Sequence, residues 1–392
     1  MVEIFSNNDH ILSNFPICLR KTVEELCLRS KISFRSIDLT DITINSIRSN
    51  NRDALDNFHF ILNVPYAGKN LKWEIIFDPE NFDFAPDFDF NDDEFLSYFD
   101  IDTITDNVPS WKNWNLKNPN ALSQVLSEFL CLYKQHQVRK LHLENIYSRY
   151  SDEYKVLIDD KNGIDEENIE VIVDGGSIHF LIRINVDCSS LPEYVQPIIY
   201  KGNNLSEHTL YNQGDDFAHL KVSVSKLDGS RSNYSIQLSP RLEQVIGNFK
   251  LSFADVPKDG TLTELVSRVS KTLESHLEQI VDHHKMKKIY ITHLAAVCFE
   301  NIIEYDSQYF SKAAFLQNVD DYNCLVTITI GTKFPLEKPS VSLSSIYCSE
   351  AKSCSKLLDT YPYNPEFKPE VNIEYLLEYL QDVIQDFQNH KH

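Results

Sequence analysis

Cysteine and histidine are the residues of this chain best suited to nucleophilic or metal chemistry, but their spacing favours neither. The 392 residues include 8 Cys and 13 His, and no two cysteines form a CxxC pair. There is no HExxH motif, and the adjacent His283 and His284 would point in different directions on a helix, which makes them a poor chelating pair. The sequence therefore predicts no metal site, and we interpret these two histidines as solvated residues at a helix end.

A nucleophilic cysteine would need exposure to solvent and a base or a helix terminus nearby. Cys131 and Cys324 follow apolar faces and are predicted to lie in the core. Cys348 and Cys354 follow a proline-bounded loop and are the remaining candidates, although no partnered histidine accompanies them, so ordinary thiols are the favoured interpretation. Cysteines scattered through a chain of this length favour thiols in a reducing compartment over a disulfide framework.

The remaining catalytic signatures are also missing from the sequence. No GxGxxG, GxxxxGK[ST] or GxSxG motif occurs among only 10 glycines, and nothing marks two of the 58 acidic residues as an acid–base pair. The sequence therefore predicts no catalytic residue and no cofactor. The net charge of −21 disfavours nucleic acid and anionic membrane surfaces and favours basic partners.

The elements that would position any site begin with a strand-rich region. Alternation of period two, typical of half-buried strands, places apolar residues at Phe58, Phe60, Leu62 and Val64, and again at Leu71, Trp73, Ile75 and Phe77. Turn-forming residues at Ala67–Gly68 separate these strands, and a third short strand is predicted at Phe88–Phe90. Asn118–Pro119 then predicts the start of a helix that extends towards Tyr147.

Similar patterns recur twice. The second region predicts strands at 180–186, 220–224 and 234–238, then a helix over 262–281 that ends near His283–Lys285, where cations suit a helix C-terminus. The third predicts a helix over 290–303, strands at 324–330 and 341–343 separated by a loop bounded by Pro335 and Pro339, and a final helix over 373–387. This order predicts an α+β fold of antiparallel meander sheets with helices on one face.

We divide the chain into three related domains, 1–147, 148–284 and 285–392, with long helices at their junctions. From Trp73 to Trp111 there are twelve Asp or Glu and no Lys or Arg. A solvated surface is the favoured interpretation of this acidic stretch, and a docking patch for a basic partner is the alternative. Neither a signal peptide nor an apolar run long enough to span a membrane is visible.

These motifs resemble the ubiquitin-conjugating (E2) fold. Two strands, then Phe84–Phe88 with Pro86, then Trp111 and a helix follow the order of that family, and residues 333–343 look like a second copy of its proline loop. Active members carry a His-Pro-Asn and a cysteine between that loop and the tryptophan, whereas Phe88–Trp111 contains neither cysteine nor histidine. The chain therefore resembles the inactive branch, the ubiquitin E2 variant (UEV) or RWD domains.

A more specific resemblance is to the BRE family. The run Pro65-Tyr66-Ala67-Gly68, followed by Leu71-Lys72-Trp73 and later by Pro86-Asp87-Phe88, is similar to that family, as are segments further along the chain. These segments are Asn118-Pro119, Leu238-Ser239-Pro240-Arg241, Ile303-Glu304-Tyr305-Asp306 and Tyr361-Pro362-Tyr363-Asn364-Pro365. The middle region carries the weakest resemblance, with Leu191–Tyr194 in place of a proline loop. The residues that mark the fold are Pro65, Tyr66, Gly68, Trp73, Pro86, Trp111, Pro335 and Pro339.

The BRE resemblance implies a non-catalytic scaffold subunit of the BRISC complex and of its BRCA A-type relative. In such complexes a JAMM-family zinc metalloprotease, held by an Abraxas-type pseudo-enzyme, cleaves ubiquitin chains of the lysine-sixty-three linkage. The scaffold tethers this pair to a small von Willebrand A-like subunit, with roles in the DNA damage response and in cytoplasmic signalling. We therefore expect a protein of cytoplasm and nucleus, with the 262–284 helix and the acidic 78–106 segment as candidate contact elements.

Two alternatives come from other classes of function. Direct binding of ubiquitin by a UEV-like face follows from the fold analogy alone. An unusual conjugating enzyme that uses Cys348 or Cys354 is the remote alternative, because the expected base and stabilising residues are missing.

Overall fold

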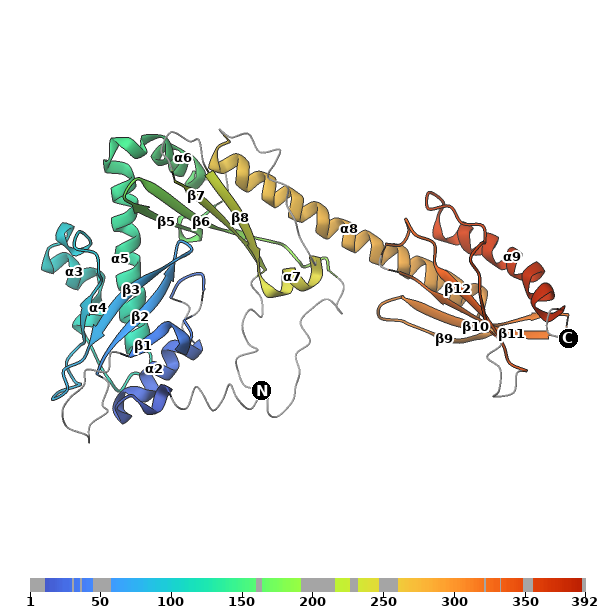
Figure 1. Cartoon of the computed structure of the whole chain (residues 1–392), viewed down its shortest axis with the longest axis horizontal. Helices are drawn as coiled ribbons and strands as arrows, with labels where there is room; N and C mark the ends of the chain where they lie inside the picture. Colours follow the sequence, from blue (N-terminus) through green and yellow to red (C-terminus); the bar gives the residue numbers. More distant parts are fainter. Residues whose placement is uncertain are drawn as a thin grey trace. The chain divides into compact units, whose positions relative to one another are not determined.

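The computed structural model describes residues 11–29, 32–35, 37–44, 58–159, 164–191, 216–225, 232–246, 260–320, 322–331, 333–347 and 355–389. The described elements form an α+β protein with three antiparallel sheets, as the sequence predicts (Figure 1). The chain divides into two compact units. The first holds the elements from α2 to the start of α8, and the second holds the rest of α8 with β9 to α9.

The first sheet of the first unit is a four-stranded meander in the order β1-β2-β3-β4. Its strands are β1 (Ile42–Ile44), β2 (His59–Tyr66), β3 (Lys69–Ile76) and β4 (Asp87–Asp89). Apolar residues alternate in β2 and β3, so one face of the sheet is buried, with Phe60, Leu62 and Trp73 completely inaccessible to solvent. The tight turn between these strands is Ala67–Gly68, as predicted, with φ of 48° and 72°.

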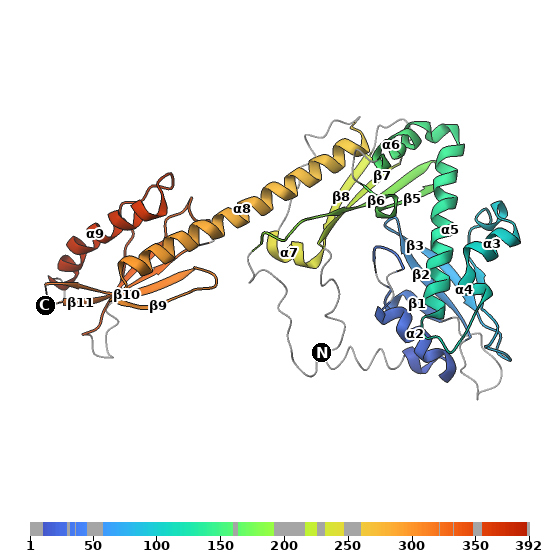
Figure 2. The same ribbon diagram turned by 180° about the vertical axis from the view of Figure 1, so that it is seen from behind.

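Helix α5 (Ala121–Leu143) covers the buried face of this sheet (Figures 1 and 2). Its apolar residues Leu122, Val125, Leu126 and Phe129 join one core with the strands. The helix begins at Ala121 rather than at the predicted Pro119, because Asn118 turns the chain instead of capping it: its side chain accepts a hydrogen bond from the Asn120 N–H, 3.1 Å away. The shorter helices α2 (Ile17–Arg29), α3 (Ile101–Asn107) and α4 (Pro109–Lys112) add side chains to the same core, and α6 (Ser148–Ile158) contacts α5.

The second sheet of this unit is another meander, in the order β5-β6-β7-β8. It consists of β5 (Ile169–Asp174), β6 (Ser177–Asn185), β7 (Phe217–Val224) and β8 (Ser232–Leu238), followed by helix α7 (Pro240–Ile246). The predicted strands at 180–186, 220–224 and 234–238 correspond to β6, β7 and β8. Helix α5 also contacts β5, and Ile172 of β5 belongs to the same core as the first sheet. Helix α5 therefore packs against both sheets of the first unit.

Helix α8 (Leu262–Val297) is a single helix of 36 residues where the sequence predicted two. The predicted end near His283–Lys285 was wrong, as was the extension of the second helix to Ile303, because strand β9 begins at Ile302. Neither Gly nor Pro occurs between residues 278 and 292, and lysine is a good helix former, so the cationic run continues the helix. His283 and His284 are consequently half-buried within the helix rather than at its end.

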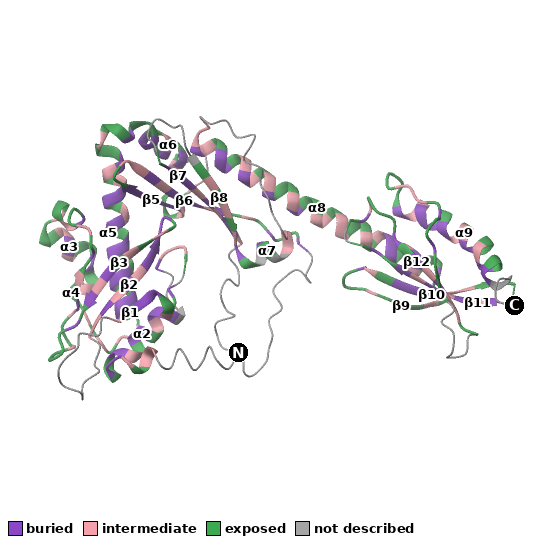
Figure 3. Ribbon diagram, viewed as in Figure 1, coloured by how far each residue is buried: buried purple, intermediate pink, exposed green. Residues whose placement is uncertain are grey.

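The second unit is built on a five-stranded sheet in the order β13-β12-β11-β10-β9. Its strands are β9 (Ile302–Tyr305), β10 (Lys312–Val319), β11 (Tyr322–Thr329), β12 (Ser340–Ser345) and β13 (Ser355–Leu357). Helix α9 (Pro369–Asn389) and the end of α8 bury one face of this sheet. Figure 3 shows the result, with buried residues concentrated along the strands and on the helix faces next to them. Among the described helices of both units, none is long and apolar enough to cross a bilayer.

Candidate functional site

The residues predicted to mark the fold lie in three places. Trp73 is in the core of the first sheet, and the Trp111 side chain donates a hydrogen bond from Nε1 to the Pro86 carbonyl, 3.0 Å away. In the second unit, the hydroxyl of Tyr363 donates to the Pro335 carbonyl at 2.5 Å. The hydroxyl of Tyr361 likewise donates to the Pro339 carbonyl. Each proline loop is thus fastened by an aromatic side chain from further along the chain.

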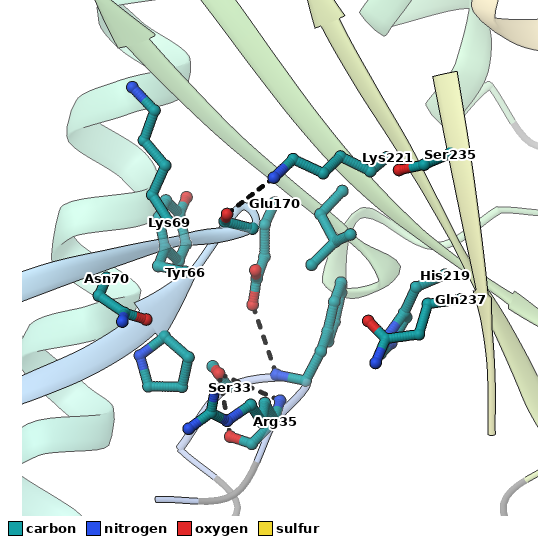
Figure 4. A pocket seen from close by; sticks show the side chains of 14 residues that line it. Ser33, Arg35, Tyr66, Lys69, Asn70, Glu170, His219, Lys221, Ser235 and Gln237 are labelled. Atoms are coloured by element: carbon teal, nitrogen blue, oxygen red, sulfur yellow. Dashed lines mark hydrogen bonds between the residues drawn. The ribbon is translucent and has the colours of Figure 1, made fainter. Parts of the chain in front are cut away.

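The third group, Pro65, Tyr66 and Gly68, lines a pocket of about 260 Å³ within the first unit. The pocket lies where the β2–β3 turn and the segment 32–35 meet the second sheet (Figure 4). The other lining residues are Ser33, Phe34, Arg35, Lys69, Asn70, Glu170, Leu181, His219, Lys221, Ser235 and Gln237. We treat this pocket as the candidate functional site because it gathers titratable groups from segments far apart in the sequence.

Glu170 is the central polar residue of the pocket. It lies on β5, is only 5% exposed, and its carboxylate accepts a hydrogen bond from the Ala67 N–H at 2.6 Å. A second, longer contact of 3.5 Å comes from the Phe34 N–H. Burial raises the pKa of Glu170 to about 7, although the two N–H groups and Lys134 act in the opposite direction. The carboxylate therefore joins the turn of the first sheet to the edge of the second.

The basic residues around Glu170 are already engaged. Lys69 forms an ion pair with Asp174 at 2.8 Å, and the Arg35 guanidinium contacts both carboxylate oxygens of Asp41 at 3.0 Å. Lys221 of β7 donates a hydrogen bond to the Gly68 carbonyl at 2.9 Å, so it also holds the β2–β3 turn. Each of these contacts restrains the turn or its neighbours.

His219 forms the aromatic wall of the pocket. Its ring stacks on Phe34 with centroids 5.3 Å apart and an interplanar angle of 18°. Burial, with a smaller contribution from Arg183, lowers its pKa to about 4. The imidazole is therefore neutral at physiological pH, and its Nε2 is buried without a hydrogen-bond partner. A neutral ring packed on phenylalanine acts here as an apolar surface rather than as a proton carrier.

The polar contacts of the pocket hold the two sheets of the first unit together. A nucleophilic mechanism needs a thiol or hydroxyl hydrogen-bonded to a base. Hydroxyl groups line the pocket, but no described hydrogen bond joins one of them to Glu170 or His219. Within the described ranges, no three His, Cys, Asp or Glu side chains gather as a metal site would require. Sequence patterns missed Glu170, His219 and Lys221. One signal for Glu170 existed, since a single charge within the apolar run Ile169–Val173 is unusual for a residue of a buried strand.

The structure describes two of the four cysteines considered in the sequence analysis. Cys324 is buried in β11, as predicted, whereas Cys131 of α5 is exposed and its predicted core position was wrong. Cys131 was assigned to the core because it lies on a helix next to apolar residues such as Leu130 and Leu132. Successive residues of a helix are rotated by about 100°, so a residue next to a buried one can lie outside the buried face. Cys348 and Cys354 lie outside the described residues.

The fold and this pocket define an α+β protein whose polar groups hold two sheets together. Its family can be stated directly: the sequence model for BRE, the brain and reproductive organ-expressed protein, matches residues 23–349, and the chain belongs to this family. The resemblance drawn from the sequence is therefore confirmed.

Two curated relatives are similar over most of their length. One is "BRISC and BRCA1-A complex member 2" of Danio rerio, 28% identical over 318 residues that cover 79% of this chain and 77% of the relative. The other carries the same name in Branchiostoma floridae and is 26% identical over 323 residues, with the same two coverages. Both names describe a member of a complex and not an enzymatic activity, in agreement with the expectation that this chain is not itself an enzyme.

Proposed function

We propose that this chain is a non-catalytic scaffold subunit of a deubiquitinase complex of the BRISC and BRCA1-A type. It tethers a JAMM metalloprotease and its Abraxas-type partner, which cleave lysine-sixty-three-linked ubiquitin chains, to a small von Willebrand A-like subunit. The observation that carries the proposal is the match to the BRE family over residues 23–349, together with relatives whose names place them in these complexes.

The architecture of the two units supports this role. We infer that the first and last sheets are UEV-like domains, within the proposed divisions 1–147 and 285–392, with a degenerate domain at 148–284 between them. In both sheets a proline loop fastened by an aromatic donor lies within the meander, between β3 and β4 or between β11 and β12, and a long helix, α5 or α9, comes after the last strand. A fold of this kind without a cysteine between Pro86 and Trp111 presents surfaces to partners rather than a reactive thiol.

The acidic 78–106 segment is the contact element that we propose for a basic partner surface. It carries eleven acidic residues and no Lys or Arg, and two of its apolar side chains, Phe84 and Ile101, are 63% and 62% exposed. Exposed apolar groups set among charges are typical of protein–protein contacts. The segment 262–284 of α8 is the second proposed contact element, and we place the protein in cytoplasm and nucleus, where such complexes act.

Co-expression with the metalloprotease and the Abraxas-type subunit, followed by size exclusion with light scattering, tests the proposal. We expect stoichiometric co-elution and a chain that cleaves no ubiquitin chains by itself. The paired variants Phe84→Asp and Leu143→Asp refine the test, because both residues are 63% exposed but Leu143 lies outside the acidic segment. Weaker co-elution of the first variant alone would support the acidic segment as a contact, whereas separate elution of the unmodified chain would refute the scaffold role.

A further inference from the structure

Strand β9 forms one edge of the five-stranded sheet and pairs only with β10 (Figure 1). Tyr305 lies opposite Ala313, and the next residue, Asp306, donates its N–H to the Lys312 carbonyl at 2.9 Å. Hydrogen bonding alternates along an antiparallel pair. The N–H and C=O of Tyr305 therefore point away from β10, and no described strand lies on that side to receive them.

Exposed apolar side chains occur on β9 and in the segment that leads into it. Phe299 is 78% exposed, Ile303 is 57% exposed and Tyr305 is 47% exposed, and Val297 at the end of α8 adds a further 53% exposed side chain. These four residues fall within nine positions of the chain. Isolated apolar residues on a surface are ordinary, but a group of four beside an open backbone edge is typical of an interaction site.

Within the part of the chain that the structure describes, the edge also lacks the features that usually protect such strands. Natural edges are guarded by charge, by proline or by a covering segment. Strand β4, an edge of the first sheet, carries Asp87 and Asp89, and β13, at the opposite edge of the second unit, carries Lys356. The single charge of β9, Glu304, is neutralised by Lys312 at 2.6 Å. An extended chain that approaches β9 therefore meets no unpaired charge on the strand itself.

We propose that β9 accepts an extended, uncharged segment of another subunit, which adds to the sheet as a sixth strand. The outward N–H and C=O of Tyr305 bind the backbone of that segment, and Phe299, Ile303 and Val297 pack against its apolar side chains. Strand addition of this kind takes its affinity from backbone hydrogen bonds and its selectivity from alternate side chains. The inference rests on the proposed role as a complex subunit and assigns one surface to that role.

Hydrogen–deuterium exchange at Tyr305, measured on the full chain alone and within the co-purified complex, tests this assignment. We expect exchange of the Tyr305 amide to slow at least about tenfold in the complex, as for other strand hydrogen bonds. Ile303→Lys, which places a charge on the edge, should reduce co-elution about tenfold. Leu336→Lys, on a 74% exposed residue of the loop between β11 and β12, is the matched control and should leave co-elution unchanged.

The outcomes separate the two proposals. If the unmodified chain co-elutes but Tyr305 exchanges equally fast in both states and Ile303→Lys binds normally, the strand-addition proposal is wrong and the scaffold role stands. If the unmodified chain does not co-elute, both fail. Protection of Tyr305 that increases with the concentration of the chain alone would show pairing with a second copy, and would overturn the assignment to another subunit.

Discussion

Two of the β-hairpins described in the first unit have nearly the same turn and very different surroundings. The β2–β3 turn, Ala67–Gly68, has φ of 48° and 72°, and the β5–β6 turn, Gly175–Gly176, has φ of 50° and 96°. Both suit a two-residue connection in which positive φ matches the twist of the strands. Ala67 is completely buried and its N–H donates to the Glu170 carboxylate. Gly175 is exposed, and no atom beyond its own residue and its chain neighbours lies within 4 Å of where a Cβ would be.

Two turns with nearly the same local geometry can therefore have different roles in the tertiary structure. The exposed hairpin needs only glycine to reverse the chain. The buried hairpin uses alanine at its first turn position and then depends on an acceptor supplied by a strand 103 residues away, because a buried N–H without a partner is costly. The first turn is therefore part of the contact between the two sheets, and changes around it should cost more than matched changes at the second.

The largest effect should come from Glu170→Ala. This change leaves the buried Ala67 N–H without its acceptor, and we expect it to lower the free energy of unfolding by about 2–3 kcal/mol at pH 6. Asp174→Ala, which removes the 65% exposed partner of Lys69 beside the second turn, should cost less than about 1 kcal/mol. All three tryptophans lie in the first unit, so denaturation followed by tryptophan fluorescence measures this unit. Equal losses of unfolding free energy in the two variants would contradict the proposed difference between the turns.

The pH dependence of stability should isolate the Glu170 carboxyl group. Its pKa is about 7 in the folded protein against an ordinary value of 4.5, so its contribution is fully present below pH 4.5 and is lost as the pH rises through 7. Relative to Glu170→Gln, the unmodified protein should gain about 2 kcal/mol between pH 8 and pH 5.5. Denaturation midpoints at several pH values check this, and parallel curves for the two proteins would contradict it.

His219 should contribute with the opposite sign. Its folded pKa of about 4 lies below its ordinary value of 6.5, so the stability of the neutral ring is present above pH 6.5 and is lost as the pH falls towards 4. We expect His219→Phe to resist acid better than the unmodified protein by about 1–2 kcal/mol at pH 5. The same fluorescence measurement applies, and an NMR titration of His219 with a midpoint near 6.5 would exclude this account.

The smallest effect should be a difference between two glycine variants. Gly68→Ala and Gly175→Ala each place a Cβ on a residue with positive φ, at a cost of about 1 kcal/mol. The new methyl at position 68 would also lie 2.9 Å from Lys221 Cε and displace that side chain from the turn, whereas at position 175 the space is open. Gly68→Ala should therefore cost more, and repeating both changes in a Lys221→Ala background, which removes the crowding atoms, should bring the two costs together.

Much of the fold could be predicted from sequence because the relevant signals are local. Alternating apolar residues gave β2 and β3, and Ala67–Gly68 gave their turn, since strand periodicity and turn chemistry depend on neighbouring residues. The single helix α8 was missed because histidines and lysines near position 284 suit a helix terminus and a helix interior almost equally well. Cys131 was misplaced because spacing alone does not define the border of a buried face.

The candidate site was less accessible to such reasoning. Pro65, Tyr66 and Gly68 were identified from the motif that they form, but Glu170, Lys221 and His219 lie on other strands, and no local pattern links them to that turn. The same holds for β9, which the sequence analysis did not predict, because Ile303 was assigned to the end of a helix. Only the strand order shows that it lies at an edge with its backbone groups open.

The sequence by itself determined the α+β class, the buried faces of the hairpins, the position of the first turn and the BRE family. The first three follow from hydrophobic burial and backbone preference, which act between near neighbours and tolerate imprecise placement. The family follows from the resemblance of particular motifs and from the match of its sequence model to residues 23–349. The tertiary structure decided which carboxylate meets the Ala67 N–H, which histidine becomes neutral and which strand edge stays open. Hydrogen bonds and charge burial depend on exact distances between distant segments, so these features exist only once the chain has folded.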